Sequence, residues 1–508
     1  MSKIYCLYIV NTLIKYTFVY LLTSLFFSII LWYFSSDMNA QTLWGNFSPL
    51  SVIKLTLIVT LLVSSISVFL LTYLYIVYQR FFYNHILYTS LDSTSAYFDF
   101  FKLRVKSLVE LHFVLDGFGL VLLNLAVFVG LISLLSLDSR FYWKNVKFIF
   151  LCHILVIAIY LFCISSDLIS FFIFYEALLI PSFLLVHYVS PYRKAIQASL
   201  YFVIWTQLGS FLVLSGIIYI IQTTGLIYFS HIKTYNFTIN EIFFLYGLFF
   251  FGFGFKIPIW PFHHWLTKTH VEAPSGFSIF LSGFLVKSAV FGFYKLSNLL
   301  GGQIDTTLFS VFAFMGVLDA SYKMWAQTDL KKLVAYGTIQ EMSMIYLVLS
   351  WGDSTATLGS LMFCITHSFL SAVLFYLVDC IQRRYRARNI VQINGLLLTN
   401  PNLATVILFT CFVFMGLPGT TKFITEFYIL SGLVESTPYT IVLVVFAVNY
   451  IGSIGFCRAW FNVVFGMSTD KHLPNQGDLS LKEALIIFFC FFNFFFFRPY
   501  YKFSYGLI

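Results

Sequence analysis

The apolar positions of the chain form long unbroken runs, not the alternation of a half-buried strand or a membrane barrel. A membrane helix needs ~20 apolar residues, and windows of this length recur along the whole sequence. They predict an all-α polytopic membrane protein with about fourteen transmembrane helices. The expected spans are 12–34, 53–78, 113–136, 147–165, 168–189, 197–222, 241–265, 275–297, 306–321, 333–350, 355–381, 402–433, 437–463 and 482–497.

Composition excludes a secreted, cytosolic or disordered protein. Of the 508 residues, 60% are apolar and 10% are charged, whereas soluble domains carry roughly 25% charged residues. The longest polar connection, 79–112, leaves no room for a second soluble domain. We therefore expect a single membrane domain over residues 1–508. Residues 1–33 resemble a signal peptide, but Lys15 interrupts them and many spans follow, which favours a retained first helix.

Positive charges recur in the connections that follow odd-numbered spans. The connection after the eleventh span is the most basic, with Arg383, Arg384, Arg386 and Arg388, whereas those after the fourth and twelfth spans carry acidic residues. The positive-inside rule predicts such an excess on one membrane face. Both termini are then expected on the opposite face.

Six of the ionisable residues within the predicted spans stand out as functional candidates. A charge in hydrocarbon costs at least ~2.5–3.5 kcal/mol on insertion scales, so each is a candidate functional residue. A carboxylate facing a buried lysine offsets the cost of desolvation and keeps protonation adjustable, as a proton relay requires. The alternative is a paired or snorkelling structural charge, and we prefer it for Lys295 and Lys422 near span ends. The candidates are Glu176, Lys256, Lys287, Glu341, His367 and Glu426.

Two predicted spans contain helix breakers beside these charges. Pro258 and Pro261 interrupt the seventh span directly after Lys256, and the segment 417–420 (Leu-Pro-Gly-Thr) interrupts the twelfth. Proline frees a backbone carbonyl, which is tolerated at membrane depth only where protein or water satisfies it. Broken helices five spans apart are typical of inverted-repeat transporters. Two ordinary proline kinks are the alternative.

The predicted repeats are residues 147–297, with spans four to eight, and residues 306–463, with spans nine to thirteen. The eight cysteines are scattered, and the sequence has no C-x-x-C, G-x-G-x-x-G or P-loop. We therefore expect no metal or cofactor in this chain.

The segment 256–274, Lys-Ile-Pro-Ile-Trp-Pro-Phe-His-His-Trp-Leu-Thr-Lys-Thr-His-Val-Glu-Ala-Pro, closely resembles the mitochondrial NADH dehydrogenase subunit 4 family. Further similar motifs are Leu115-Asp-Gly117, Asp329-Leu-Lys-Lys-Leu-Val-Ala-Tyr336, the segment around His367 and Gly416-Leu-Pro-Gly-Thr420. The resemblance covers roughly residues 110–435.

This resemblance implies an antiporter-like, proton-translocating subunit of respiratory complex I, NADH:ubiquinone oxidoreductase. NADH, FMN, iron–sulfur clusters and ubiquinone are then expected in partner subunits. The implied partners are flanking antiporter-like subunits and membrane lipids such as cardiolipin, with no nucleic acid. The implied location is the mitochondrial inner membrane. The 63 Phe and 33 Tyr are consistent with mitochondrial encoding, since AT-rich genomes favour their codons.

Matching positions suggest the role of each candidate. Glu176 and Lys256 resemble the family's carboxylate–lysine pair, Lys287 the next relay lysine, His367 a central relay residue and Glu426 the terminal protonatable group. The family usually has histidine where this chain has Glu341, which inverts the charge of that group, and Thr267 replaces a common proline.

Two other functions remain open. A cation/proton antiporter subunit would share the fold and the buried lysines, and sodium/proton exchange without NADH or quinone would favour it. A purely structural membrane spacer is disfavoured because it would gain nothing from so many buried charges. The lack of a long C-terminal amphipathic helix disfavours subunit 5, and the length and span count disfavour subunit 2.

The positive-inside pattern generates a topology prediction. The connection with Arg383, Arg384, Arg386 and Arg388 should face the mitochondrial matrix, and both termini the intermembrane space. A cysteine-reactive label or a protease added to sealed mitoplasts should therefore not reach this connection. Labelling from the intermembrane side would show that the predicted topology is wrong.

Overall fold

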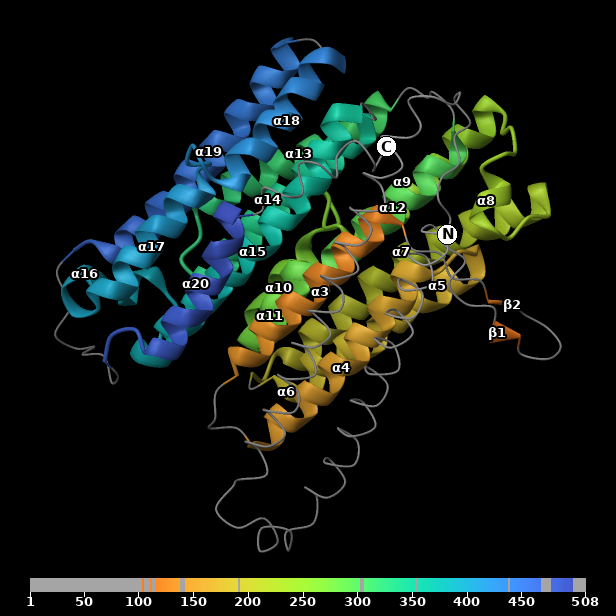
Figure 1. Ribbon diagram of the computed structural model, residues 1–508. Helices are drawn as coiled ribbons and strands as arrows, with labels where there is room; N and C mark the ends of the chain where they lie inside the picture. Colours follow the sequence, from red (N-terminus) through yellow and green to blue (C-terminus); the bar gives the residue numbers. More distant parts are fainter. Residues whose placement is uncertain are drawn as a thin grey trace, which may run out of the picture. The chain divides into compact units, whose positions relative to one another are not determined.

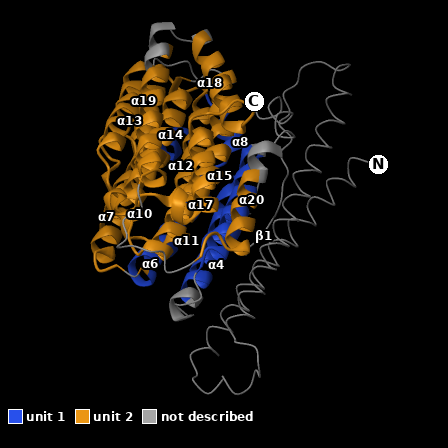
Figure 2. Ribbon diagram, turned by 90° about the vertical axis from the view of Figure 1, so that its left-hand side faces the viewer, with its two compact units in different colours: residues 1–189, 219–235, 505–507 blue, residues 190–218, 236–504, 508 orange. Residues whose placement is uncertain are grey.

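The computed structural model describes residues 103–104, 110–111, 116–137, 142–190, 192–301, 306–351, 354–436, 439–466 and 477–496. The predicted spans 12–34 and 53–78, and most of the connection 79–112, lie outside the described residues. The chain forms two compact units (Figure 2). Unit 1 comprises residues 1–189, 219–235 and 505–507; unit 2 comprises 190–218, 236–504 and 508.

Unit 1 contains the helices of the predicted third to fifth spans. Helix α4 packs against its neighbours α3, α5 and α6. Asp167 caps the start of α5: its carboxylate accepts a hydrogen bond from Ser170 N at 2.8 Å, in the first turn of the helix. The elements are β1 (Leu103–Arg104) paired antiparallel with β2 (Glu110–Leu111), α3 (Gly117–Leu135), α4 (Tyr142–Ile164), α5 (Leu168–Ala177), α6 (Leu179–Val189) and α8 (Phe229–Ile232).

Unit 2 contains the remaining helices, apart from the last turns of α7 (Figure 1). Its elements are α7 (Ala195–Thr224), α9 (Ile239–Lys256), α10 (His264–Glu272), α11 (Ser275–Phe280), the π-helix η2 (Leu281–Leu285), α12 (Val286–Leu300), α13 (Thr307–Trp325), α14 (Leu330–Trp351), α15 (Ser354–Tyr385), the 3₁₀ turn η3 (Ile390–Gln392), α16 (Leu396–Thr399), α17 (Pro401–Phe414), α18 (Thr421–Ser436), α19 (Tyr439–Val464) and α20 (Leu481–Phe496).

These elements confirm the all-α polytopic fold. Within the described residues, eight helical segments are long and apolar enough to cross a membrane. Both predicted breaks are present: the seventh span is α9 and α10, and the twelfth is α17 and α18. The described spans agree with the predicted ones to within a few residues, except that the seventh ends at Glu272 and not at 265. The fifth span is divided between α5 and α6, and the short helices α8 and α16 were not predicted. The division into inverted repeats stays a prediction.

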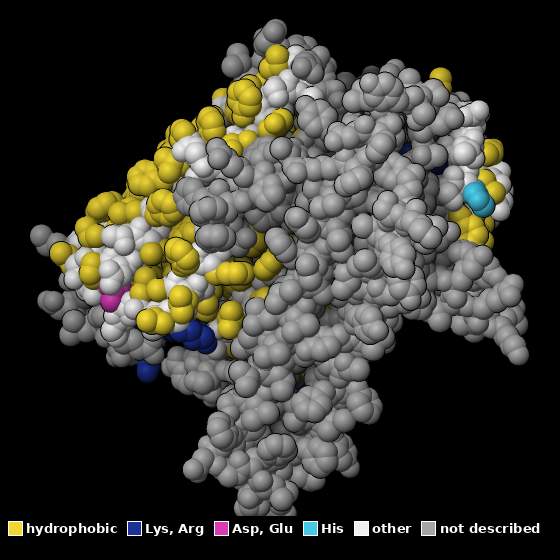
Figure 3. Space-filling model, in the orientation of Figure 1, with side chains coloured by type: hydrophobic (Ala, Val, Ile, Leu, Met, Phe, Trp, Pro, Cys, Tyr) yellow, Lys and Arg dark blue, Asp and Glu magenta, His cyan; other side chains and the backbone are white. Residues whose placement is uncertain are grey.

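The burial pattern of unit 2 suits an apolar surrounding. Large apolar side chains lie exposed on α17, α18 and α20, among them Phe412, Phe427 and Phe488. Figure 3 shows hydrophobic side chains gathered over this part of the surface. Helix α14 is instead buried along nearly its whole length. Glu341, near the middle of α14, is therefore shielded from the surroundings.

The last turn of the seventh span and the connections after the fifth, ninth and eleventh spans meet at one end of unit 2. Arg388 Nη1 donates to Val271 O at 3.0 Å, and Arg388 Nε lies 2.8 Å from Asp329 Oδ2. Ser190 Oγ donates to Glu272 O. The odd-numbered connections that are rich in basic residues thus lie on the same end of this unit, as the charge pattern predicts.

Helices α15 and α18 approach each other closely through glycines. A Cβ atom at Gly359 would lie 2.8 Å from Ile429 N, and one at Gly432 would lie 2.7 Å from Ala356 Cβ. The same two helices carry His367 and Lys422. The glycines therefore set the spacing at which these side chains can meet.

This close approach predicts a packing defect in Gly359→Ala. The new methyl group would contact backbone atoms of α18, so the free energy of unfolding should fall by about 1–3 kcal/mol. Gly247→Ala is the matched control, since its Cβ would lie 3.5 Å from the Phe309 ring, at ordinary van der Waals distance. Thermal unfolding in detergent compares the two, and equal melting temperatures would contradict this account of α15 and α18.

Candidate functional site

The first helix break places Lys256 at the end of α9. Pro258 and Pro261 carry no N–H, so the helix cannot continue regularly past this point. The Trp265 indole N–H donates to the Phe255 carbonyl at 2.8 Å, which satisfies one group that the break frees. The Lys256 side chain is buried in unit 2 at this position.

The second break, between α17 and α18, provides a ligand for a lysine. Helix α17 ends at Phe414, and Gly416 and Gly419 take left-handed backbone conformations with φ of 83° and 96°. The Phe414 carbonyl accepts a hydrogen bond from Lys422 Nζ. The interruption of the helix thus supplies an oxygen for a buried ammonium group.

Lys287 lies next to the π-helical turn η2. Its Nζ donates to the Ser282 carbonyl within that turn and contacts His367 Nδ1. Both ionisable side chains are buried, at 0% and 3% exposure. Short π-helical segments often occur at functional sites, and here the segment offers a carbonyl to a lysine.

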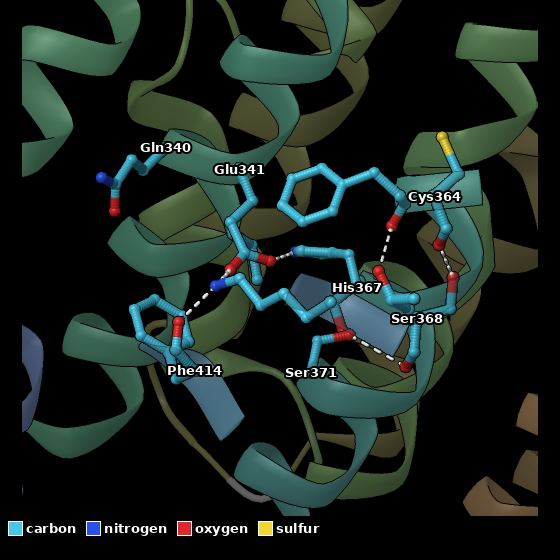
Figure 4. A network of polar contacts seen from close by, with 12 residues as sticks. Gln340, Glu341, Cys364, His367, Ser368, Ser371 and Phe414 are labelled. Atoms are coloured by element: carbon cyan, nitrogen blue, oxygen red, sulfur yellow. Dashed lines mark hydrogen bonds and ion pairs between the residues drawn. The ribbon is translucent and has the colours of Figure 1, made fainter. Parts of the chain in front are cut away.

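The row continues from His367 to the twelfth span. His367 Nε2 lies 3.7 Å from Glu341 Oε2, and Glu341 Oε1 lies 2.5 Å from Lys422 Nζ. Lys422 Nζ lies 3.7 Å from Glu426 Oε1. Figure 4 shows Glu341 between His367 and the side chain that reaches Phe414. Five ionisable residues on α12, α15, α14 and α18 thus form a continuous row, which we call the polar row.

The charges of the polar row are balanced when the histidine is neutral. The row then holds two lysines and two carboxylates, so its positive and negative charges are equal in number, and buried charges require this compensation. Lys422 serves both carboxylates, one in a close ion pair and the other at longer range. A small movement of Lys422 therefore changes how strongly its positive charge compensates Glu341 and how strongly it compensates Glu426.

The structure brings four of the six predicted site residues together: Lys287, Glu341, His367 and Glu426. Lys256 lies in the same unit at the first break, whereas Glu176 lies in unit 1 on α5 and is partly exposed. The pairing of Glu176 with Lys256 stays a prediction.

Sequence reasoning missed Lys422, which it treated as a structural charge near a span end. This residue does lie at the start of α18, but its side chain is only 3% exposed. Two signals in the sequence pointed to it: the preceding helix break and the spacing of four residues to Glu426, which places both side chains on one helix face.

A second polar cluster follows the first break. His263 Nε2 lies 2.9 Å from Asp319 Oδ2, and Lys323 Nζ lies 2.6 Å from the same oxygen. The cluster ties the segment between α9 and α10 to α13. Among the residues that the structure describes, no group of three or more His, Cys, Asp or Glu could hold a metal ion.

Comparison with known proteins identifies the family. Residues 165–452, more than half of the chain, match the family model described as NADH:quinone oxidoreductase/Mrp antiporter, transmembrane. The chain belongs to this family. The match includes both broken helices and every residue of the polar row.

Several relatives of this chain carry the name NADH-ubiquinone oxidoreductase chain 4. The NADH-ubiquinone oxidoreductase chain 4 of Paramecium tetraurelia is 45% identical over 382 residues, which cover 75% of this chain and 80% of the relative. The Arabidopsis thaliana protein of the same name is 31% identical over 417 residues, 80% of this chain and 83% of the relative.

Solved structures show the same fold. A chain of the structure "Respiratory complex I from Thermus thermophilus with bound NADH" aligns with a TM-score of 0.77 at 20% identity, covering 97% of this chain and 98% of that chain. A chain of the archaeal membrane-bound sulfane sulfur reductase complex aligns with a TM-score of 0.79 at 16% identity, covering 98% of each chain.

The close pair of Glu341 and Lys422 predicts non-additive stability effects. Either Glu341→Met or Lys422→Met leaves a buried charge without its partner and should lower the free energy of unfolding by about 3–5 kcal/mol. The double variant removes both charges and should lose less than either single variant, because Glu426 is partly exposed and can take up a proton. Thermal unfolding of all three variants gives the coupling; additive losses would contradict a compensated pair.

Proposed function

We propose that this chain is the subunit-4-type proton-translocating membrane subunit of NADH:ubiquinone oxidoreductase, respiratory complex I. The observation that carries the proposal is the polar row, which crosses the buried helices of unit 2 without a gap longer than 3.7 Å. Family membership and the names of the relatives support the same activity.

His367 has the geometry of a proton shuttle within the row. Its Nδ1 faces Lys287 and its Nε2 faces Glu341, so a proton taken up on one nitrogen leaves from the other. A proton that reaches Glu341 neutralises the carboxylate. The ion pair with Lys422 then weakens, and Lys422 gains freedom to move toward Glu426. There Lys422 can pass a proton to Glu426 and take up the proton held by Glu341, so the terminal carboxylate is protonated without any redox group in the chain.

Lys256 is proposed as the switch that couples the row to the rest of the complex, with Glu176 as its movable partner. The break after α9 leaves a position where the backbone is irregular and water can enter. Loss of a nearby carboxylate makes a buried lysine release its proton more readily, and return of the carboxylate reverses this.

The remaining assignments follow from the same proposal. The chain holds no cofactor, and NADH, FMN, the iron–sulfur clusters and ubiquinone bind to partner subunits. It lies in the mitochondrial inner membrane beside flanking antiporter-like subunits, with lipids such as cardiolipin against its apolar surface. A cation/proton antiporter is the second candidate, because the family description also names the Mrp antiporter.

The test is a comparison of Lys256→Arg with Lys256→Ala in the intact complex. Arginine keeps the positive charge but does not release its proton near neutral pH. Both variants should therefore assemble and lose most proton pumping and coupled NADH oxidation, by at least about tenfold, an effect of about 1.4 kcal/mol on the rate-limiting barrier. Proton uptake by inner-membrane vesicles during NADH oxidation measures this.

Lys295→Arg is the matched control. Lys295 is a partly exposed lysine on α12, lies over the Phe291 ring and has no role in the proposed relay. This variant should pump normally. Near-normal pumping by Lys256→Arg would show that Lys256 is a structural charge, and sodium/proton exchange without NADH oxidation would favour the antiporter.

A further inference from the structure

His263 lies in the segment that folds back onto the end of α9 at the first break. The Phe262 ring stacks on the Phe255 ring with 4.0 Å between the centroids, and the Trp265 indole N–H donates to the Phe255 carbonyl. Residues on both sides of His263 therefore contact the residue that precedes Lys256. This packing places the backbone of His263 beside the last turn of α9, which carries Lys256.

The imidazole of His263 contacts two charged residues on α13. Its Nε2 lies 2.9 Å from Asp319 Oδ2, and Lys323 Nζ lies 2.6 Å from the same oxygen and 3.2 Å from Nε2. The His263 side chain is 1% exposed, whereas those of Asp319 and Lys323 are 26% and 32% exposed. These three residues, which we call the histidine cluster, thus connect the surface of α13 with a buried imidazole.

The contact with Asp319 determines which nitrogen of His263 carries the proton. Without a hydrogen on Nε2, the lone pair of this nitrogen would face a carboxylate oxygen at 2.9 Å, which is repulsive. The neutral imidazole therefore carries its proton on Nε2 and donates it to Asp319, which leaves the lone pair on Nδ1. Within the described part of the chain, no group forms a hydrogen bond with the buried His263 Nδ1. Buried polar atoms are nearly always hydrogen-bonded, so we expect a water molecule as its partner.

We propose that the histidine cluster is a proton-loading site for Lys256, in which Asp319 and Lys323 change the proton affinity of His263 in opposite directions. His263 Nδ1 takes up a proton from water at the first break and later returns it to water, while the hydrogen on Nε2 stays on Asp319. The Asp319 carboxylate stabilises the imidazolium, and the Lys323 ammonium destabilises it. This inference rests on the proposed function, since it requires Lys256 to exchange protons. His263 carries the proton, and Asp319 and Lys323 are positioning residues.

Other titratable groups near the cluster come from α10 and α14. The His264 ring lies 4.4 Å from the His263 ring, measured between centroids, and Lys323 Nζ lies 5.9 Å from the centroid of the Tyr336 ring. These groups are retained when Asp319 or Lys323 is replaced. Shifts of opposite sign in the two variants therefore report the two charges of the cluster.

The first experiment measures the pH profile of proton pumping in proteoliposomes that contain the assembled complex. Loading requires a protonated His263, so pumping should fall on the alkaline side of the profile as this proton is lost. Asp319→Asn removes the stabilising charge, so the alkaline limb should move by about one pH unit to lower pH. Lys323→Gln removes the destabilising charge, so the limb should move to higher pH. A cluster that only ties α13 to the break would not give shifts of opposite sign.

Asp319→Glu and Asp379→Asn are the controls. Glutamate keeps the negative charge, so the limb of Asp319→Glu should lie closer to that of the wild type than the limb of Asp319→Asn. Asp379 pairs with Arg383 on α15 at the same spacing of four residues that joins Asp319 to Lys323, and Asp379→Asn should leave the limb unchanged. Where Asp319→Asn fails to assemble, Lys323→Gln decides alone. A limb that stays in place or moves to lower pH in Lys323→Gln overturns the proposal.

The second experiment records infrared difference spectra of the complex, with isotopically labelled histidine, in the presence and absence of NADH. The ring bands that disappear in His263→Gln belong to His263, and they should show the tautomer with hydrogen on Nε2. In Asp319→Asn, part of their intensity should change to the other tautomer, because the carboxylate no longer selects one nitrogen. His263 bands that are the same in both proteins overturn the proposal, as does the absence of any His263 band.

The two proposals fail separately. If Lys256→Arg pumps at the normal rate, Lys256 is not the switch, and the loading site loses the residue that it serves, so both proposals are overturned. If Lys256→Arg stops pumping while Asp319→Asn and Lys323→Gln leave the profile unchanged, only the loading site is overturned.

Discussion

The ion pair between Glu341 and Lys422 is the contact on which the arrangement of unit 2 depends. A buried ammonium or carboxylate is tolerated only when an opposite charge and further hydrogen bonds compensate it. Lys422 finds both, in Glu341 at 2.5 Å and in the Phe414 carbonyl at the second break. The break, the burial of α14 and the glycine contacts between α15 and α18 all serve to bring these partners together.

Because of the same constraint, the polar row responds when one of its groups gains or loses a proton. Every member lies close to at least one other ionisable group. A proton gained by one residue therefore changes how well the charge of its neighbour is compensated. Lys287 is held by a carbonyl of a π-helical turn and Lys422 by a carbonyl of a broken helix. Irregular backbone therefore occurs where the lysines need oxygen ligands, while the intact helices α14 and α15 carry Glu341 and His367.

Most of the fold follows from sequence patterns, because a membrane helix requires a long apolar run and a proline leaves a clear interruption. The two breaks were predicted for these reasons. Lys287, Glu341, His367 and Glu426 were selected because each is ionisable within an apolar run, and their roles in one relay came from the family resemblance. Lys422 was not, because its position near a helix start is also typical of an interfacial lysine; only packing shows that α15 and α17 cover it. The hydrogen bond from Gln340 to Asn449 was not predicted either, because it depends on a contact between α14 and α19 that no local pattern encodes.

The end of unit 2 that carries the basic connections has a mechanical consequence. Arg388 joins its own connection to Asp329 in the preceding one and to Val271 in the last turn of α10. Ser190, in a third connection, is hydrogen-bonded to Glu272 of the same turn. These helices are held together at one end by several hydrogen bonds. They can slide past one another at that end only if these hydrogen bonds break at the same time. The two interrupted helices are then the parts of the unit that can bend most easily. Movement during a transport cycle is therefore expected at the residues that flank Lys256 and Lys422.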